Sequence, residues 1–408
     1  MQVVYERCCG LDVHKETVVA CVITPRGKEI QTFSTMTNNL LELADWLSEL
    51  EVTHVAMEST GVFWKPIYNL LESDFEAMVV NAQHIKAVPG RKTDVKDAEW
   101  IAELLQHGLI RASFIPDRPQ RELRELVRYR RSLIHQRGQV VNRIQKVLEG
   151  ANIKLSSVAT DVVGASGRAM LQAMVNGTED PKALAEMAKG RLKNKRPELE
   201  EALKGLVNDH QRMMLDSLLR HLTFLDEEIE RLDAEVARRM LPFEETIQHV
   251  MEMPGMGRRN AEEVLAEIGT DMSRFPSANH LASWAKMCPG NNESAGKRKS
   301  GSTGHADSWL RSALVEAAWS ASRTKETYFS AQYRRLAPRR GKKKAIFALG
   351  HTILVTIYHI IRDKTDYHDL GCDYFSKRSS SYIIQRAIRQ IEKCGMTVTL
   401  KPLQPVFS

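Results

Sequence analysis

The order of strand and helix patterns in residues 1–112 constrains the fold more than any other feature of the chain. Three runs rich in apolar and β-branched residues follow one another across short turns, which predicts an antiparallel meander. Helical and short apolar patterns then alternate, which predicts buried strands joined by helices. The expected strands are 3–13, 17–24, 29–36, 54–57 and 77–80, and the expected helices are 39–50, 63–71 and 94–107.

This order is that of the ribonuclease H-like and RuvC-like folds, so we expect an α/β domain at the N-terminus. The remaining chain reads as mostly helical, and 408 residues exceed what one core usually holds. We therefore expect a RuvC-like domain, a helical middle, a helical C-terminal domain and a polar tail. Their expected bounds are 1–112, 113–241, 242–362 and 363–408.

Two long helices are expected in the middle of the chain. Residues 120–149 read as one basic helix, and apolar residues recur at steps of three and four from Leu215 to Val236, as in a coiled coil. The second helix can pack on the first or on another protomer, and the sequence does not decide between them. Residues 151–195 have no clear period, and we assign them no role.

A Pro-Gly-Met-Gly turn, Pro254 to Gly257, precedes an expected helix at 259–268. Exposed backbone N–H groups in such a turn can hold a phosphate, as in a helix-hairpin-helix element. The same residues can equally form a plain tight turn between two helices.

The charge of the chain is unevenly distributed. Residues 1–112 carry 10 Lys and Arg against 16 Asp and Glu, and the rest carries 48 against 35, so that the total is +7. An acidic N-terminal part joined to a basic remainder suits a metal-binding nuclease domain beside surfaces that bind a polyanion.

The cysteines and apolar runs indicate a cytoplasmic protein that does not span a membrane. Six cysteines show no zinc spacing and are expected to be reduced thiols, and we see no secretory signal. The longest apolar run, 345–361, is shorter than a membrane-spanning helix and is interrupted by polar residues, so we expect a buried or dimer-forming helix.

Four carboxylates are expected to meet at one edge of the N-terminal sheet. Asp12 and Glu58 follow apolar strands, and Asp94 and Asp97 lie three residues apart on one face of an expected helix. Each acid alone is an ordinary surface residue, but a cluster of carboxylates is electrostatically costly without a cation. Hard oxygen ligands suit Mg²⁺, with Mn²⁺ as the alternative, and two such ions can support phosphoryl transfer.

Other side chains are candidates for contact with nucleic acid. His14 and Lys15 are expected in the turn after the first strand, where they touch substrate or simply form a hairpin. Ser294 lies in an expected flexible Gly/Ser/Lys loop, and Ser300 and Ser302 are alternatives to it as a nucleophile. The basic residues expected to bind nucleic acid are Arg121, Arg124, Arg128, Arg131, Lys297, Arg298, Lys299, Arg339, Arg340, Lys342 and Lys343.

Several motifs together resemble the DEDD transposases of insertion sequence family one-hundred-and-ten. They are Glu58-Ser59-Thr60-Gly61, Arg91-Lys92-Thr93-Asp94-x-x-Asp97-Ala98, the turn at Pro254 and Pro289-x-x-x-x-Ser294. The form around Ser294 resembles the subgroup numbered eleven-eleven. The sequence departs from the usual pattern at Ala295, where glycine commonly follows the serine, and at Ala82, where proline is frequent.

The resemblance implies a DNA recombinase of an insertion sequence, guided by a bridge RNA from the noncoding end of the element. It implies that Asp12, Glu58, Asp94 and Asp97 hold Mg²⁺ and that Ser294 forms a phosphoserine link with DNA. It also implies homodimers that assemble into tetramers. The alternatives are a RuvC-like hydrolytic nuclease or junction resolvase, in which Ser294 is structural, and a scaffold without catalytic activity.

Overall fold

A computed structural model of the chain describes residues 2–59, 61–81, 97–289, 292–294, 297–300, 303, 308–378 and 380–399. The described chain forms two compact units, Met1–Arg121 and Glu122–Ser408. The first is mixed α/β and the second is almost entirely helical, in agreement with the expected fold class. The first unit is compatible with a ribonuclease H-like domain.

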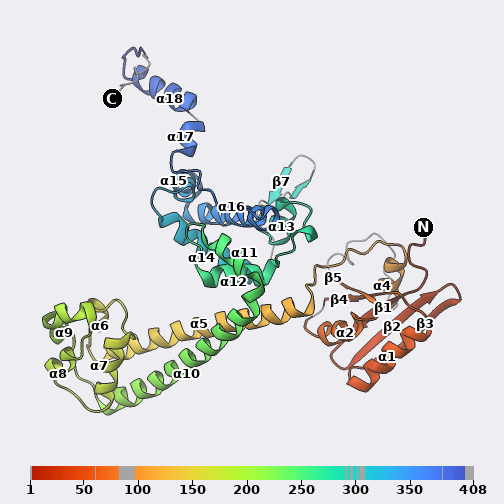
Figure 1. Ribbon diagram of the computed structural model, residues 1–408, viewed down its shortest axis with the longest axis horizontal. Coiled ribbons are helices and arrows are strands. Elements are labelled where there is room, and N and C mark those ends of the chain that lie inside the picture. Colours follow the sequence, from red (N-terminus) through yellow and green to blue (C-terminus); the bar gives the residue numbers. More distant parts are fainter. Residues whose placement is uncertain are drawn as a thin grey trace. The chain divides into compact units, whose positions relative to one another are not determined.

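One five-stranded sheet organises the first unit (Figure 1). Its order is β3-β2-β1-β4-β5, with β1–β3 antiparallel and β4 and β5 parallel to β1. The strands are β1 (Cys8–Val13), β2 (Thr17–Thr24), β3 (Gly27–Ser34), β4 (His54–Glu58) and β5 (Glu76–Val80).

Helices cover both faces of this sheet. On one face, alternate residues of β1 such as Cys9 and Leu11 pack with helices α1 (Thr37–Glu49) and α2 (Trp64–Leu71). On the other face, Cys8 and Ala56 pack with α4 (Asp97–Gln106). Because successive strand residues point to opposite faces, Asp12 and Glu58 belong to the face that α4 covers.

The strand and helix order predicted for this unit is confirmed, with shifts at the element ends. The first strand is shorter than predicted because its chain pairs with β2 only from Cys8 onward. The third strand ends at Ser34 and not at residue 36, and the helix predicted over 94–107 is described from Asp97 to Gln106. Asp94 lies outside the described residues.

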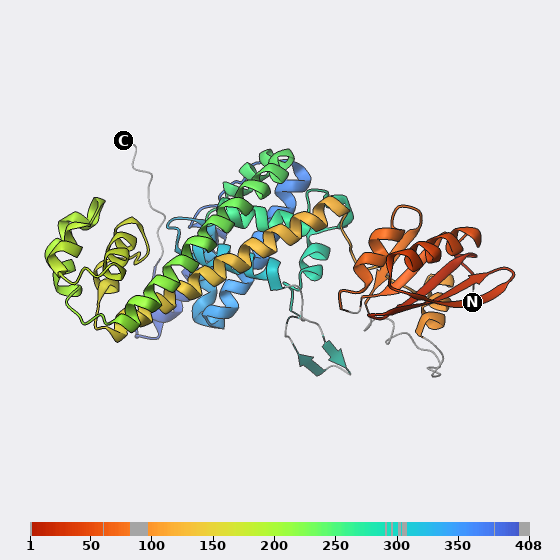
Figure 2. The same cartoon turned by 90° about the horizontal axis from the view of Figure 1, so that it is seen from below.

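Two long antiparallel helices form the central part of the second unit. Helix α5 (Arg118–Gly150) and helix α10 (Asp209–Met240) lie side by side (Figures 1 and 2). Ion pairs join Arg130 to Asp233 and Arg137 to Asp226, so residue numbers rise along one helix as they fall along the other. The leucine stripe of α10 is therefore covered by α5 of the same chain, the first of the two possibilities that the sequence left open.

Short helices fill the segment between α5 and α10, where no clear period was found. They are α6 (Leu155–Val158), α7 (Ala165–Val175), α8 (Pro181–Glu186), η1 (Gly190–Lys195) and α9 (Arg196–Ala202). Their apolar residues join the core of α5 and α10. None of these helices is longer than about three turns, which explains why the sequence pattern did not reveal them.

The C-terminal part packs around α16 (Lys342–Asp363), which contacts α13 (Ala278–Trp284), α14 (Ser308–Arg323) and α15 (Tyr328–Arg340). Helix α16 contains the longest apolar run and is the one described helix long and apolar enough to cross a membrane; 56% of its most apolar stretch is buried within the unit. Buried helices of protein cores have the same length and composition.

The other elements are η2 (Leu241–Phe243), α11 (Glu244–Met251), α12 (Arg258–Ile268), η3 (Met272–Arg274), β6 (Asn292–Ser294), β7 (Lys297–Ser300), α17 (Tyr374–Arg378) and α18 (Ser380–Glu392).

Candidate catalytic site and nucleic-acid surfaces

Asp12 and Glu58 occupy equivalent positions on neighbouring parallel strands. The last pair in the register of β1 and β4 is Leu11 with Met57, and the two acids are the next residue of each strand. Residues at matching positions of parallel strands face the same side of a sheet. The strand order predicted from the sequence thus brings these two carboxylates to one edge and one face.

Gly10 allows α4 to approach the sheet beside these acids. A Cβ atom at Gly10 would lie 2.3 Å from the Ala98 carbonyl oxygen and 2.4 Å from the Ala102 nitrogen. Only glycine permits such close contact between a strand and a helix backbone. Asp97, the first residue of α4, is consequently held near Asp12, which lies two residues beyond Gly10 on β1.

The electrostatics of Asp12 reflect this convergence. Burial raises the pKa of the Asp12 carboxyl, and the charges of Asp97 and Glu58 raise it further, whereas His14 lowers it. The His14 Nε2 atom lies 3.0 Å from Asp12 Oδ2. Three carboxylates from β1, β4 and α4 therefore interact at one edge of the sheet, with a single imidazole beside them.

The donor chemistry of this edge fits a hard divalent cation. Carboxylate oxygens are the preferred ligands of Mg²⁺ and Mn²⁺, and a cation would offset both the burial and the carboxylate repulsion that raise the pKa of Asp12. Within the described ranges, no group of three or more His, Cys, Asp or Glu side chains is close enough to hold a metal ion. The fourth predicted ligand, Asp94, belongs to residues 82–96, which the structure does not describe.

His14 and Lys15 lie in the tight turn between β1 and β2, as predicted. The His14 backbone N–H donates to the Thr17 carbonyl oxygen, and the Thr35 hydroxyl donates to the Lys15 carbonyl oxygen. The backbone of this turn is therefore held on both sides. The His14 side chain is 61% exposed, so it can contact a bound substrate as well as Asp12.

Ser294 lies at the end of a short strand and not in the flexible loop that we predicted. Strand β6 pairs with β7 in an antiparallel two-stranded sheet, with Ser294 opposite Lys297. The Gly-rich flanks suggested a flexible loop, but cross-strand backbone hydrogen bonds do not require apolar side chains. The side chains of Ser294, Lys297, Arg298 and Lys299 lie outside the described part, so their contacts stay predictions.

The arginines of α5 that we expected to bind nucleic acid contact acidic residues of their own unit. Arg128 makes two hydrogen bonds to Glu267, at 2.7 and 2.9 Å, and Arg131 contacts Glu263 and Glu316. Arg124 donates to the carbonyl oxygens of Ala266 and Glu267. In the first unit, Arg121 pairs with Glu72 and donates to Asn69. These contacts hold helices together and leave nucleic-acid binding by the four arginines untested.

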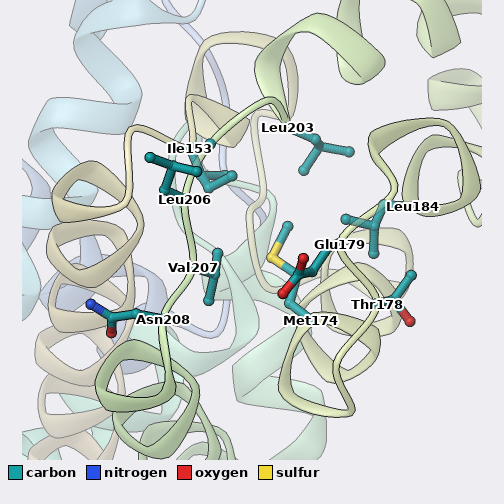
Figure 3. A pocket seen from close by; sticks show the side chains of 10 residues that line it. Ile153, Met174, Thr178, Glu179, Leu184, Leu203, Leu206, Val207 and Asn208 are labelled. Atoms are coloured by element: carbon teal, nitrogen blue, oxygen red, sulfur yellow. The ribbon is translucent and has the colours of Figure 1, made fainter.

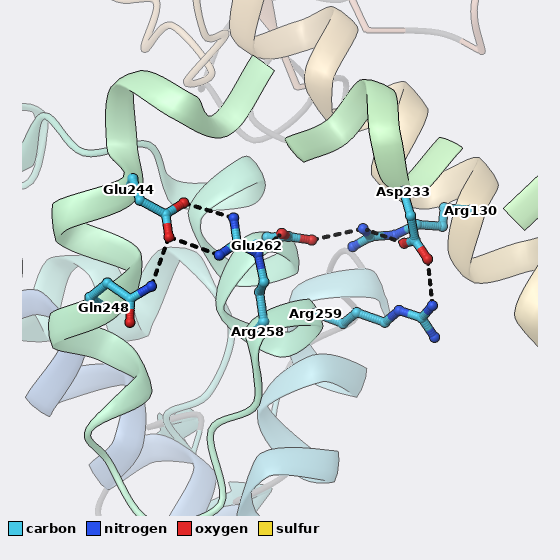
Figure 4. Close-up of polar contacts among 7 residues, drawn as sticks. All are labelled: Arg130, Asp233, Glu244, Gln248, Arg258, Arg259 and Glu262. Atoms are coloured by element: carbon cyan, nitrogen blue, oxygen red, sulfur yellow. Dashed lines mark hydrogen bonds and ion pairs between the residues drawn. The ribbon is translucent and has the colours of Figure 1, made fainter. Parts of the chain in front are cut away.

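Arg130 belongs to the same polar network but was not singled out from the sequence. It is 1% exposed and bridges Asp233 of α10 and Glu262 of α12, as Figure 4 shows. Glu262 also binds Arg258, which pairs with Glu244. The Arg130 Nε and Nη2 atoms have no hydrogen-bond partner among the described residues. Its place on the apolar stripe of α5, between Val127 and Leu133, is the sequence signal that marks it as buried.

The Pro254–Gly257 turn packs on α14. Gly255 has φ +84°, and a Cβ atom there would lie 2.3 Å from the Ala321 nitrogen and 2.7 Å from the Ala317 carbonyl oxygen. Gly255 is therefore required for close packing between this turn and a helix. This contact explains the glycine at 255 in both interpretations that the sequence allowed, and phosphate binding by the turn stays a prediction.

The basic residues around Gly341 are exposed, in contrast to those of α5. Arg339 and Arg340 end α15, and Lys342 and Lys343 begin α16. Across the described ranges none of these four side chains has an ion-pair partner. Lysines at a helix N-terminus repel the positive end of the helix dipole, so a bound anion would stabilise this arrangement.

Two cavities of the second unit lie apart from all of these residues. Figure 3 shows the first, of about 280 Å³, between the short helices and the start of α10. The second, of about 450 Å³, lies between α11 and the end of α16. The residues that line these two cavities include none of the predicted site residues.

Known proteins resemble this chain in both units. A DEDD transposase family model of the IS110 type matches residues 9–153, and a model described as "Transposase IS116/IS110/IS902 family" matches residues 247–334. The four predicted acids lie in the first match and Ser294 lies in the second. Together the matches cover more than half of the 408 residues.

Two curated proteins show the same relationship. The "Insertion element IS116 uncharacterized 44.8 kDa protein" of Streptomyces clavuligerus is 27% identical over 318 residues, which are 69% of this chain and 75% of that protein. The "Transposase for insertion sequence element IS1533" of Leptospira borgpetersenii is 30% identical over 160 residues, which are 36% of this chain and 44% of the relative.

Proposed function

The chain is an IS110-family transposase of an insertion sequence, and we propose that it cuts and rejoins DNA through a phosphoserine intermediate formed with the help of a divalent metal site. The family accounts for DNA as the partner and for cleavage and rejoining as the activity. The metal, the serine and guidance by RNA are the specific parts of the proposal.

One observation carries the metal site: the register of β1 and β4 aligns Asp12 with Glu58, and the close contact at Gly10 holds the start of α4, with Asp97, beside Asp12. In agreement with this placement, burial and the charges of Asp97 and Glu58 raise the pKa of Asp12. Carboxylates held together in this way favour a bound cation, and Asp94 would add a fourth oxygen ligand. When bound, Mg²⁺ or Mn²⁺ would stabilise the charge that develops on the scissile phosphate.

The serine accounts for rejoining without an external energy source. In the proposed step the Ser294 Oγ atom bonds to phosphorus, the bond from phosphorus to the leaving deoxyribose oxygen breaks, and the hydroxyl proton passes to a base. The phosphoserine keeps the cut end activated, so that a sugar hydroxyl of the new partner strand can displace the serine. Hydrolysis would instead lose this activation.

Guidance by a bridge RNA from the noncoding end of the element would supply sequence specificity by base pairing. The protein would then need mainly contacts to nucleic-acid backbones. The exposed Arg339, Arg340, Lys342 and Lys343 support such contacts because none of them forms an ion pair within the described chain. We further propose that homodimers assemble into tetramers during recombination.

Trapping a covalent adduct tests the proposal. Labelled DNA carrying an element end is incubated with the protein, its copurified RNA and Mg²⁺, and denaturing gels then detect labelled protein. We expect an adduct with the native chain and with the matched controls Ser300→Ala and Ser302→Ala, but none with Ser294→Ala. Cleaved DNA without any adduct would favour a hydrolytic RuvC-like nuclease and would overturn the serine mechanism.

The copurified RNA provides a separate test of guidance. One discrete structured transcript would support a bridge RNA, and random cellular fragments would contradict it.

A further inference from the structure

Three exposed apolar side chains lie at the sheet edge that bears the carboxylates. Met36, Val62 and Phe63 are 70%, 62% and 38% exposed. Single exposed apolar residues are common on protein surfaces. Met36 directly precedes α1 and Phe63 directly precedes α2, so these side chains share one edge of the sheet with the acids, where the chain passes to the face that α1 and α2 cover.

Backbone pairing places Met36 on one side of the acids. Ser34 at the end of β3 pairs with Thr17 at the start of β2, and the Thr35 N–H donates to the Glu16 carbonyl oxygen. Met36 follows directly. It therefore lies beyond the turn that contains His14 and Lys15.

Val62 and Phe63 lie on the other side, in the connection between β4 and α2. This connection leaves the sheet at Glu58, and the Lys65 N–H donates to the Val62 carbonyl oxygen. A Cβ atom at Gly61 would lie 3.6 Å from two carbons of the Phe63 ring, so the ring folds back over the connection. The buried residues of α2 are Ile67 and Leu71, and neither Val62 nor Phe63 belongs to a core of the described unit.

The chemistry of this edge matches one nucleotide of a DNA strand. The carboxylates suit a metal-bound phosphate, Lys15 supplies a positive charge, and an exposed aromatic ring offers a face on which a base can stack. In an intact duplex the faces of the bases are covered by their neighbours, so the ring can be used only by an unstacked base.

We propose that Phe63 stacks on an unpaired nucleobase next to the scissile phosphate, and that Met36 and Val62 provide apolar contacts to the adjoining nucleotides. The substrate of the carboxylate site is then a locally unpaired DNA strand. This inference rests on the proposed function of that site and names the form of its substrate.

Equilibrium binding without cleavage tests the inference. The full chain is titrated into a short single-stranded DNA that contains 2-aminopurine, with Ca²⁺ in place of Mg²⁺, and fluorescence reports both binding and stacking. We expect Phe63→Ala to weaken binding about tenfold and to reduce the quenching of 2-aminopurine, because one base stacked on an aromatic ring contributes about 1–3 kcal/mol. Phe63→Trp should retain both signals.

Leu109→Ala is the matched control. Leu109 is 39% exposed in the same unit and follows the end of α4 that is remote from Asp97. The Leu109→Ala variant should bind the single-stranded DNA like the native chain. In all variants the slope of log K against log salt should stay unchanged, since no phosphate contact is removed.

Unchanged binding and quenching in Phe63→Ala would overturn the inference. A change in the oligomeric state of Phe63→Ala, with native quenching, would also overturn it and would identify the edge as a protein interface. Both results are obtained without strand cleavage, so they are distinguishable from a failure of the serine mechanism.

Discussion

Gly10 of β1 lies against Ala98 of α4 so closely that a Cβ atom at Gly10 would be 2.3 Å from the Ala98 carbonyl oxygen. No side chain fits between the strand and the helix at this point. The contact fixes the start of α4, and with it Asp97, relative to Asp12. A residue without a functional group thereby determines the geometry of the candidate metal site.

We predict that Gly10→Ala abolishes DNA cleavage and lowers the free energy of unfolding by about 2–3 kcal/mol. The added methyl group must displace backbone atoms of α4, a form of overpacking. Denaturant unfolding and the cleavage assay measure the two effects. Gly138→Ala in α5 is the matched control, because a Cβ atom there meets nothing within 4 Å. The Gly138→Ala variant should be more stable than the native chain by up to about 1 kcal/mol. Native cleavage activity in Gly10→Ala would contradict the role assigned to the contact between β1 and α4.

We predict that Asp12→Asn stabilises the metal-free protein while it lowers DNA cleavage by about 100-fold or more. The raised pKa of Asp12 means that its contribution to stability falls as the pH rises from the ordinary value of 3.8 through the folded value. Asparagine removes this penalty at neutral pH. Unfolding midpoints in EDTA and in Mg²⁺ measure the change, and the variant should lose the stabilisation that Mg²⁺ gives to the native chain. A lower midpoint of Asp12→Asn in EDTA would show that the buried charge of Asp12 does not destabilise the metal-free protein.

We predict opposite consequences for arginines of α5 and lysines of α16. Lys343→Ala should reduce the slope of log K against log salt for DNA binding by about one and leave stability unchanged. Arg128→Ala should lower the free energy of unfolding by about 2 kcal/mol, because Glu267 is 3% exposed and would lose two hydrogen bonds. Salt titrations and denaturant unfolding distinguish the two. If Arg128→Ala reduced this slope as much as Lys343→Ala and kept native stability, Arg128 would be a nucleic-acid contact and not a structural ion pair.

We predict that the second unit loses stability below about pH 4.5, in part through Glu244. Hydrogen bonds from Arg258 and Gln248 lower the pKa of Glu244 from 4.5 to about 2. The stabilisation is complete above the unfolded value and is lost as the pH falls from 4.5 toward 2. Glu244→Gln should therefore show a weaker dependence of the thermal midpoint on pH in that interval. Parallel curves for the variant and the native chain would contradict this assignment.

The strand order and the two strand-borne acids could be predicted from the sequence because local patterns determine them. Alternating apolar residues place Asp12 and Glu58 on the strands, and parallel pairing aligns them. The approach of α4 to Gly10 could not be predicted in the same way, since it depends on which helix meets which strand. A glycine inside an apolar strand was the available signal.

For the arginines of α5, the sequence predicted the helix correctly but not the partners of its side chains. Their spacing predicted a basic helix, and the helix is present. Sequence spacing contains no information about Glu267, which is 139 residues from Arg128 along the chain. Whether a guanidinium group faces phosphate or carboxylate depends on tertiary contacts, and the 58 Lys and Arg residues therefore overstate the number of cations that are free to bind nucleic acid.

The antiparallel pairing of α5 with α10 has a consequence for synthesis on the ribosome. Helix α5 ends at Gly150, and α10, which covers its apolar stripe, runs from Asp209 to Met240. At typical translation speeds α10 is completed roughly 5–20 s after α5, and the apolar stripe of α5 stays uncovered for that time. During that interval the nascent chain exposes a continuous apolar helix surface, so chaperone supply and translation rate should govern the yield of correctly folded protein.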